Sequence, residues 1–220
     1  MSEWSILWEA RQSFIDGTIN TLKIFGLSVS LGFVLGCLML LVLENHKKLG
    51  RLVKLWIDVM RMLPFLVLAY LFYYGLPELG VRLNAWTAGI IALVLYHGAY
   101  FAEILRGTRL SLPAGQIEAA KAHGFRPLAL YWRITLPQLL LKSRLLLGNQ
   151  LIYALKDTAF LSILTVQELT SAANSVQTTY FIPTEAFLVV IALYWLISIA
   201  LELLLKWAAR FGTKRGFEHA

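Results

Sequence analysis

The chain is poor in charged residues and almost devoid of cysteine. Only 15% of its 220 residues are Asp, Glu, Lys or Arg, whereas a water-soluble domain typically carries about 25%. Hydrophobic residues make up 58% of the chain, and its mean hydropathy is +0.66. The shortage of charge excludes an ordinary soluble domain and indicates a protein embedded in lipid.

The single cysteine, Cys37, lies within an apolar run and excludes an internal disulfide. The His and Cys residues show no spacing typical of a metal site, so we expect no metal. The sequence also lacks the Gly-x-x-x-x-Gly-Lys-Ser/Thr pattern that cradles nucleotide phosphates. We therefore expect no cofactor in this chain, and the absence of a nucleophile–base pair argues against an enzyme.

Five apolar runs are long enough to cross a bilayer, which takes about 20 residues each. They cover residues 18–43, 52–76, 86–105, 145–165 and 186–207. These runs predict an all-α, polytopic membrane protein with about five transmembrane helices.

The positions of the basic residues predict how the chain is oriented. Fifteen of the 20 Lys and Arg residues fall in segments 47–54, 106–144 and 206–215, and only Arg11 and Arg82 lie on the opposite side. The positive-inside rule makes the richer side cytoplasmic, with the N-terminus outside and the C-terminus inside. This distribution explains the net charge of +7 better than nucleic-acid binding does.

The predicted organisation has three parts. Residues 1–17 form an interfacial segment on the outer face, residues 18–210 form the transmembrane domain, and residues 211–220 form a cytoplasmic tail. The outer segment 166–185 is polar enough to dock an external partner, although a solvated connector explains it equally well.

The cytoplasmic segment 106–144 is far longer than an ordinary connection between helices, and its apolar content argues against disorder. Glu118 is expected in the first turn of a short helix, where the positive helix pole favours a carboxylate. Gly124 follows where a left-handed helix cap is expected, and Phe125 places an aromatic side chain at the corner. Pro127 favours the start of a second helix.

We expect Pro137 to stop or kink this second helix before the next span. The segment then forms a helix–corner–helix knob that can fill a groove on a soluble partner. Its residues leave one alternative open, an amphipathic segment that binds lipid headgroups through Arg126 and Arg133.

These residues resemble the signature loop of integral membrane permease subunits of binding-protein-dependent ABC importers. The signature reads Glu118-Ala119-Ala120, Gly124 and Ile134-Thr135-Leu136-Pro137 here. Other stretches resemble the polar amino-acid subfamily, which includes histidine, glutamine, arginine and cystine permeases. These stretches are Arg61 with Pro64-Phe65-Leu66, Gly75-Leu76-Pro77, Gly98-Ala99-Tyr100-Phe101-Ala102-Glu103 and Lys156-Asp157-Thr158.

The resemblance implies a permease subunit that imports a polar amino acid or a derivative such as an opine, by alternating access, across the bacterial cytoplasmic (inner) membrane. It implies three kinds of partner besides membrane lipid: ABC ATPase subunits that hold ATP and Mg, a second permease that is identical or paralogous, and a periplasmic or extracellular solute-binding protein. The residues implied to couple to the ATPase are Glu118, Ala119, Ala120, His123, Gly124, Phe125 and Arg126.

Charged residues inside the predicted spans each cost about 3 kcal/mol at mid-bilayer, so they are expected to face a bundle interior or a water-filled cavity. Arg61 or Lys156 suits the carboxylate of an amino acid, and Glu103 or Asp157 suits its ammonium. The candidate substrate-pathway residues are Arg61, Tyr100, Glu103, Lys156, Asp157 and Thr158. A salt bridge from Glu103 to Arg106, and helix packing for Tyr100, are the alternatives.

A second class of function is an ion-coupled secondary transporter that works without an ATPase. The large cytoplasmic knob and the absence of inverted repeats argue against it.

Overall fold

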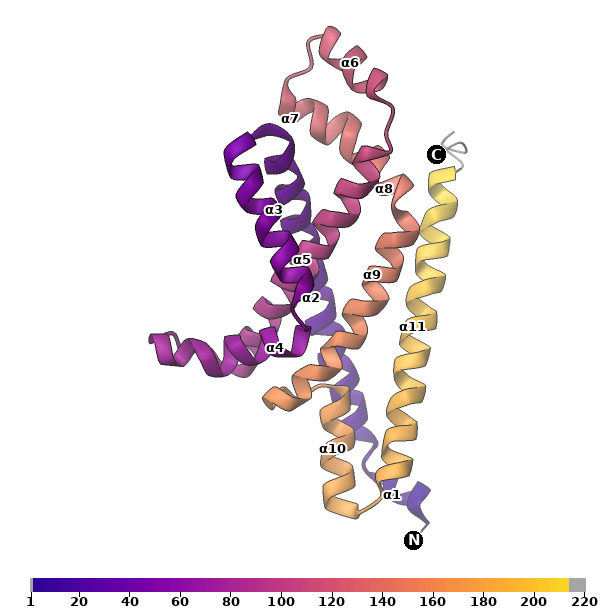
Figure 1. Ribbon diagram of the computed structural model, residues 1–220. Coiled ribbons are helices and arrows are strands. Elements are labelled where there is room, and N and C mark those ends of the chain that lie inside the picture. Colours follow the sequence, from indigo (N-terminus) through magenta and orange to yellow (C-terminus); the bar gives the residue numbers. More distant parts are fainter. Residues whose placement is uncertain (1, 214–220) are drawn as a thin grey trace.

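The computed structural model describes residues 2–213, and within that range it contains helices and no strand, which confirms the all-α prediction (Figure 1). The elements are, in chain order, α1 (Glu3–Glu9), α2 (Arg11–Asn45), α3 (Lys47–Met62), α4 (Phe65–Tyr70), η1 (Leu71–Gly75), η2 (Leu76–Leu79), α5 (Ala85–Leu110), α6 (Ala114–Ala122), α7 (Pro127–Leu130), η3 (Tyr131–Thr135), α8 (Leu136–Lys142), α9 (Arg144–Asp157), η4 (Thr158–Leu164), α10 (Leu169–Tyr180) and α11 (Pro183–Thr213).

The long helices α2 and α5 form the centre of the bundle, and small residues allow their backbones to approach closely. Gly32 and Gly36 are spaced four apart on α2, the small-xxx-small pattern that favours close helix packing in membranes. A Cβ added at Gly32 would lie 3.4 Å from the Gly98 nitrogen of α5. A Cβ added at Gly36 would lie 2.8 Å from Phe101 Cβ and 2.9 Å from the Ala102 nitrogen.

We expect Gly36→Ala to lower the free energy of unfolding by about 1–3 kcal/mol, the usual cost of overpacking. The new methyl group meets atoms of α5 that cannot move aside, so α2 and α5 must separate. Gly26→Ala is the matched control, because Gly26 lies on the same helix and nothing is within 4 Å of an added Cβ. Thermal unfolding in detergent should show a lower midpoint for Gly36→Ala alone, and equal midpoints would contradict the packing argument.

The predicted span 52–76 is not one straight helix. The chain bends by 106° between α3 and the segment Phe65–Leu79. Leu63 has extended dihedrals (φ −83°, ψ 141°), which the ring of Pro64 favours in the residue before it. The segment α4–η1–η2 consequently leaves the bundle as an arm (Figure 1).

Three described helices are long and apolar enough to cross a membrane: α2, α5 and α11 through Trp207. The bent pair Lys47–Met62 and Phe65–Leu79 makes a fourth if it counts as one span. The predicted span 145–165 corresponds to α9, of 14 residues, followed by the 3₁₀ segment η4. The number of five spans therefore stays a prediction.

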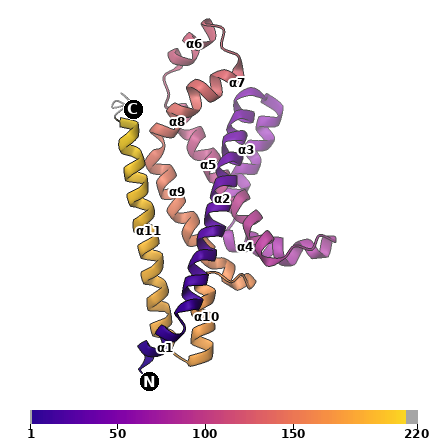
Figure 2. The same cartoon turned by 180° about the vertical axis from the view of Figure 1, so that it is seen from behind.

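Helices α10 and α11 form an antiparallel pair at the end of the bundle that holds the N-terminus. Leu7 and Phe14 pack in one apolar cluster with Ala173, Ala186 and Val190. The N- and C-terminal ends of the described chain lie at opposite ends of the molecule in both views (Figures 1 and 2).

The helix ends in the structure differ from the predicted boundaries of the outer segment 1–17 and of the tail 211–220. Helix α2 begins at Arg11, inside the predicted outer segment 1–17. Helix α11 continues to Thr213, inside the predicted tail, and residues 214–220 lie outside the described residues.

Candidate functional site

Segment 111–130 forms a knob at the end of the molecule where α11 ends, opposite the N-terminus (Figure 1). Helix α6 ends in a Schellman motif: Phe125 N donates to Ala120 O at 3.1 Å, and Gly124 N donates to Lys121 O at 2.9 Å. Gly124 has φ +77°, the left-handed conformation that glycine adopts most easily. The predicted corner at Gly124 and the helix start at Pro127 are therefore present.

The knob has an interior of its own, formed by Ile117, Ala120 and Leu130 with Ile134 packed against them. Among the predicted coupling residues, Ala120 belongs to this interior. The others are exposed: Glu118, Ala119, His123, Gly124, Phe125 and Arg126. These six residues form the surface that the knob offers to a partner.

One local prediction for the knob is wrong. Glu118 is the fifth residue of α6 and not in its first turn, because the helix begins at Ala114, directly after Pro113. Pro137 does not stop the helical path: the π-helical turn η3 comes directly before it, and Pro137 occupies one of the first two positions of α8. The kink, which was the other expectation for Pro137, stays a prediction.

The root of the knob is tied to the bundle through Tyr131. Its phenol donates a hydrogen bond of 2.6 Å to Cys37 O of α2. Burial raises the pKa of Tyr131, so the phenol keeps the proton that it donates. Leu112, Leu136 and Leu139 pack around this contact. The knob is therefore connected to α2 by a buried hydrogen bond and by packed side chains.

A charge cluster lies where α3 crosses α5, with Glu103 at its centre. Arg106 Nε and Nη2 each donate to a different Glu103 oxygen at 2.7 Å, and Arg61 Nη1 lies 3.3 Å from Oε1. Lys54 Nζ lies 3.5 Å from Oε2 and pairs with Asp58. Three cations thus surround the half-buried carboxylate of Glu103. The cluster includes the expected Glu103–Arg106 salt bridge.

Aromatic side chains continue from this cluster along one face of α5. The Tyr100 ring lies under the Arg61 guanidinium, 5.6 Å from centroid to Cζ, and the Tyr100 hydroxyl lies 3.4 Å from the Tyr96 hydroxyl. Tyr96, Tyr100 and Glu103 occupy positions i, i+4 and i+7 and share one face of the helix. Their side chains are half-buried, and Arg61 is 36% exposed. We call Arg61, Tyr96, Tyr100 and Glu103 the α5 track.

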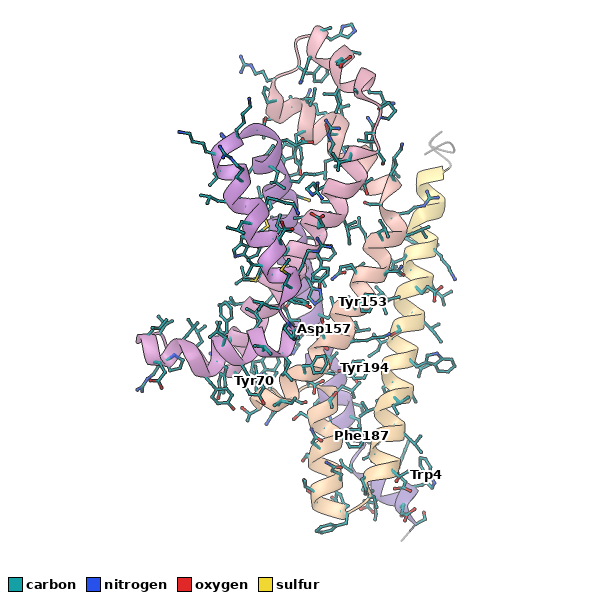
Figure 3. All side chains as sticks on the ribbon, in the orientation of Figure 1. Trp4, Tyr70, Tyr153, Asp157, Phe187 and Tyr194 are labelled. Atoms are coloured by element: carbon teal, nitrogen blue, oxygen red, sulfur yellow. The ribbon has the colours of Figure 1, made fainter. Side chains whose placement is uncertain are left out.

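The far end of the α5 track reaches α9 through His97. Gln150 Nε2 donates to His97 Nδ1 at 2.8 Å, so a neutral His97 carries its proton on Nε2. That nitrogen lies 3.3 Å from Asp157 Oδ2, and the rings of Tyr96 and His97 are 5.4 Å apart. Figure 3 shows Asp157 about midway along the molecule. Acidic Asp157 and basic Arg61 therefore lie towards opposite ends of one polar and aromatic face.

The other two candidates, Lys156 of α9 and Thr158 of η4, lie elsewhere. Consecutive helical residues do not share a face, and Lys156 points away from Asp157 into a groove of about 460 Å³ with Tyr194 and Trp195. Thr158 is fully buried, and its hydroxyl donates to Leu155 O at 2.7 Å. The consecutive residues Lys156, Asp157 and Thr158 thus lie in three different environments.

The members of this site that were missed in the sequence include Tyr96, Lys54 and Gln150. Lys54 joins the Glu103 cluster, and its spacing of four from Asp58 was the available signal. Gln150 orients His97, and its polarity inside a predicted span was the available signal.

Buried Glu168 is a further polar residue that hydropathy did not single out, and its partners indicate a structural role. Its carboxylate accepts from the Ser171 nitrogen at 2.7 Å, the Thr170 nitrogen at 2.9 Å and the Tyr194 hydroxyl at 2.8 Å. Glu168 therefore caps α10 and ties it to α11.

Comparison with known proteins gives consistent matches over nearly the whole chain. The model of the family described as "Binding-protein-dependent transport system inner membrane component" matches residues 28–211. The octopine transport system permease protein OccM of Rhizobium radiobacter is 33% identical over 217 residues, which cover 93% of this chain and 89% of OccM. The glutamine transport system permease protein GlnP of Escherichia coli (strain K12) is 31% identical over 212 residues, which cover 93% of this chain and 94% of GlnP.

A solved structure agrees with these relatives. The crystal structure of an amino acid ABC transporter with histidines superposes with a TM-score of 0.85 at 30% identity, and the match covers 96% of this chain and 99% of that one.

Proposed function

This chain belongs to the family of binding-protein-dependent transport system inner membrane components, as a permease subunit of an ABC importer, and from that premise we propose that it imports a polar amino acid or an opine. The proposed location is the bacterial inner membrane. ATP and Mg bind to a separate ATPase subunit, a solute-binding protein delivers the solute from outside, and a second permease, identical or paralogous, completes the pathway.

The single observation that carries the coupling proposal is the knob. Six of its seven predicted coupling residues are exposed, while Ile117, Ala120 and Leu130 give it an interior that holds its shape. Phe125, 37% exposed at the corner, is the type of aromatic anchor that dominates binding energy at interfaces. We propose that this surface fills a groove on the ATPase and passes its motion to α2 through Tyr131.

We propose that solute moves along the α5 track. Arg61 supplies a cation for the carboxylate of an amino acid, and Asp157 supplies an anion for its ammonium. Tyr96 and Tyr100 between them offer hydroxyls and ring faces. Asp157 is 20% exposed at its side chain and so is accessible to a small solute. Lys156, in a separate groove, is a weaker candidate for the same carboxylate.

Reconstitution tests this function directly. Proteoliposomes that contain the chain, its ATPase and its binding protein should take up labelled glutamine, histidine, arginine or octopine only when ATP is supplied, and a protonophore should leave the rate unchanged. Uptake that needs no ATPase and stops with the protonophore would instead support an ion-coupled transporter.

We expect Asp157→Asn to reduce ATP-driven uptake roughly tenfold. The substitution removes a charge-assisted contact worth about 1.5 kcal/mol, and a difference of 1.4 kcal/mol is a factor of ten. Asp16→Asn is the control, because Asp16 is exposed near the start of α2 and bonds only Gln12 on its own helix. Assembly with the ATPase should be normal in both variants, and unchanged uptake in Asp157→Asn would remove Asp157 from the pathway.

A further inference from the structure

A groove of about 780 Å³ separates the cytoplasmic halves of α9 and α11, and α2, α5 and α8 form its remaining wall. We call it the α9–α11 groove. It lies on the side of α9 that faces α11, and the α5 track with Asp157 is not part of its lining. Its volume is in the range of sites for small molecules.

The walls of the α9–α11 groove are apolar for most of their length. Phe33 of α2, Phe101 of α5, Leu147 of α9 and Leu205 of α11 are among the side chains that line it. In the most apolar 18-residue stretch of α11, only 6% is buried inside the chain. Along these walls a polar amino acid would lose much of its hydration and find few uncharged hydrogen-bonding side chains, such as Ser30 and Asn149, to replace it.

Cations stand at one end of this groove. Arg144 and Lys206 both line it, as does Glu202, which pairs with Lys206 at 2.6 Å. Arg144 is exposed and has no hydrogen-bond or ion-pair partner in the described part of the chain. The groove thus combines a long apolar surface with one cation, Arg144, that is available to pair with an anion from another molecule.

Only a molecule with an anionic head and long apolar tails complements both features. The cations belong to the chain end that the positive-inside rule places in the cytoplasm, where anionic lipids and basic pockets between helices meet. We infer that the α9–α11 groove binds an anionic phospholipid, with its phosphate on Arg144 and its acyl chains along Phe33, Leu147 and Leu205. The lipid fills the space between α9 and α11 and supports α11, which has little protein around it.

Native mass spectrometry of the permease–ATPase complex, with phosphatidylglycerol or phosphatidylcholine added, tests this inference. We expect bound phosphatidylglycerol to exceed phosphatidylcholine about fivefold, the factor for one basic residue beside an anionic headgroup. Arg144→Gln should bring the two lipids to parity. Arg82→Gln is the control, because Arg82 is exposed in the loop before α5 and lines no part of the groove.

A second variant tests the acyl-chain half of the site. Ser30 is exposed on α2 and lines the groove away from the cations, so Ser30→Phe should reduce the binding of both lipids about equally. If this variant fails to fold, the Arg144→Gln comparison decides alone.

Three outcomes would overturn the inference. They are equal binding of both lipids to the unaltered chain, displacement of phosphatidylglycerol by inorganic phosphate, and cross-linking of Ser30→Cys to a second permease in a Cys37→Ser background. The first two would show that the groove does not bind an anionic lipid specifically, and the third would show that protein occupies the groove. All three leave the proposed transport function intact.

Discussion

We expect Gly124→Val to reduce ATP-driven uptake by about 100-fold and to release the ATPase during purification. Gly124 has φ +77°, which costs a residue with a Cβ about 1–2 kcal/mol. The corner that presents Phe125 then changes shape, and loss of a central interface anchor costs at least about 2 kcal/mol. Together these losses correspond to about 100-fold in binding. The measurements are co-purification of the ATPase and uptake into proteoliposomes.

Gly115→Val is the matched control for the corner. Gly115 lies in α6 of the same knob, has helical dihedrals, and has nothing within 4 Å of an added Cβ. Valine is slightly favoured over glycine within a helix, so uptake should be preserved. Space is equally free at Gly124, where an added Cβ also meets nothing within 4 Å. The comparison therefore isolates the backbone conformation, and equal uptake in the two variants would disprove the importance of the left-handed corner.

The second large effect is expected for Glu103→Gln, which should lower the free energy of unfolding by about 3 kcal/mol. The substitution keeps the volume of the side chain but leaves Lys54, Arg61 and Arg106 around a neutral amide. Removing one partner of a buried ion pair usually costs about 3–5 kcal/mol, and the partial exposure of the three cations favours the lower end. In a protein of this size the midpoint should fall by about 6–12 °C.

Glu202→Gln provides the comparison for this effect. Its pair with Lys206 is 2.6 Å long, but the two side chains are 52% and 64% exposed. Exposed pairs of this kind contribute at most about 1 kcal/mol. Thermal unfolding in detergent should therefore show a large decrease for Glu103→Gln and a small one for Glu202→Gln. Equal decreases would mean that the cluster around Glu103 does not hold α3 against α5.

The knob was largely predictable from sequence because its geometry is local. A Schellman motif involves hydrogen bonds between residues at most five apart, so a glycine after a short helix former is sufficient to indicate it. The π-helical turn η3, directly before Pro137, was not indicated by the sequence. Ala120 was expected at the surface, but its exposure depends on where α7 packs.

The arm formed by α4, η1 and η2 shows how hydropathy alone can mislead. Apolar residues stand on both sides of Leu63-Pro64, so the average over a window gives one continuous span. The restriction that Pro64 places on Leu63 was visible in the sequence. Its consequence, a bend of 106°, was not, because a proline near a helix end can also be accommodated with little bending.

The sequence by itself determined the lipid-embedded, all-helical class, the glycine corner of the knob and the family, since these depend on composition and on residues close together in the chain. Tertiary structure alone decided which charges from distant parts of the chain meet. Asp157 lies 3.3 Å from His97 of α5, whereas neighbouring Lys156 lines a groove with Tyr194 of α11, because successive residues of a helix point in different directions. Glu103 likewise lies 3.5 Å from Lys54, which is 49 residues away in the chain, because α3 packs against α5.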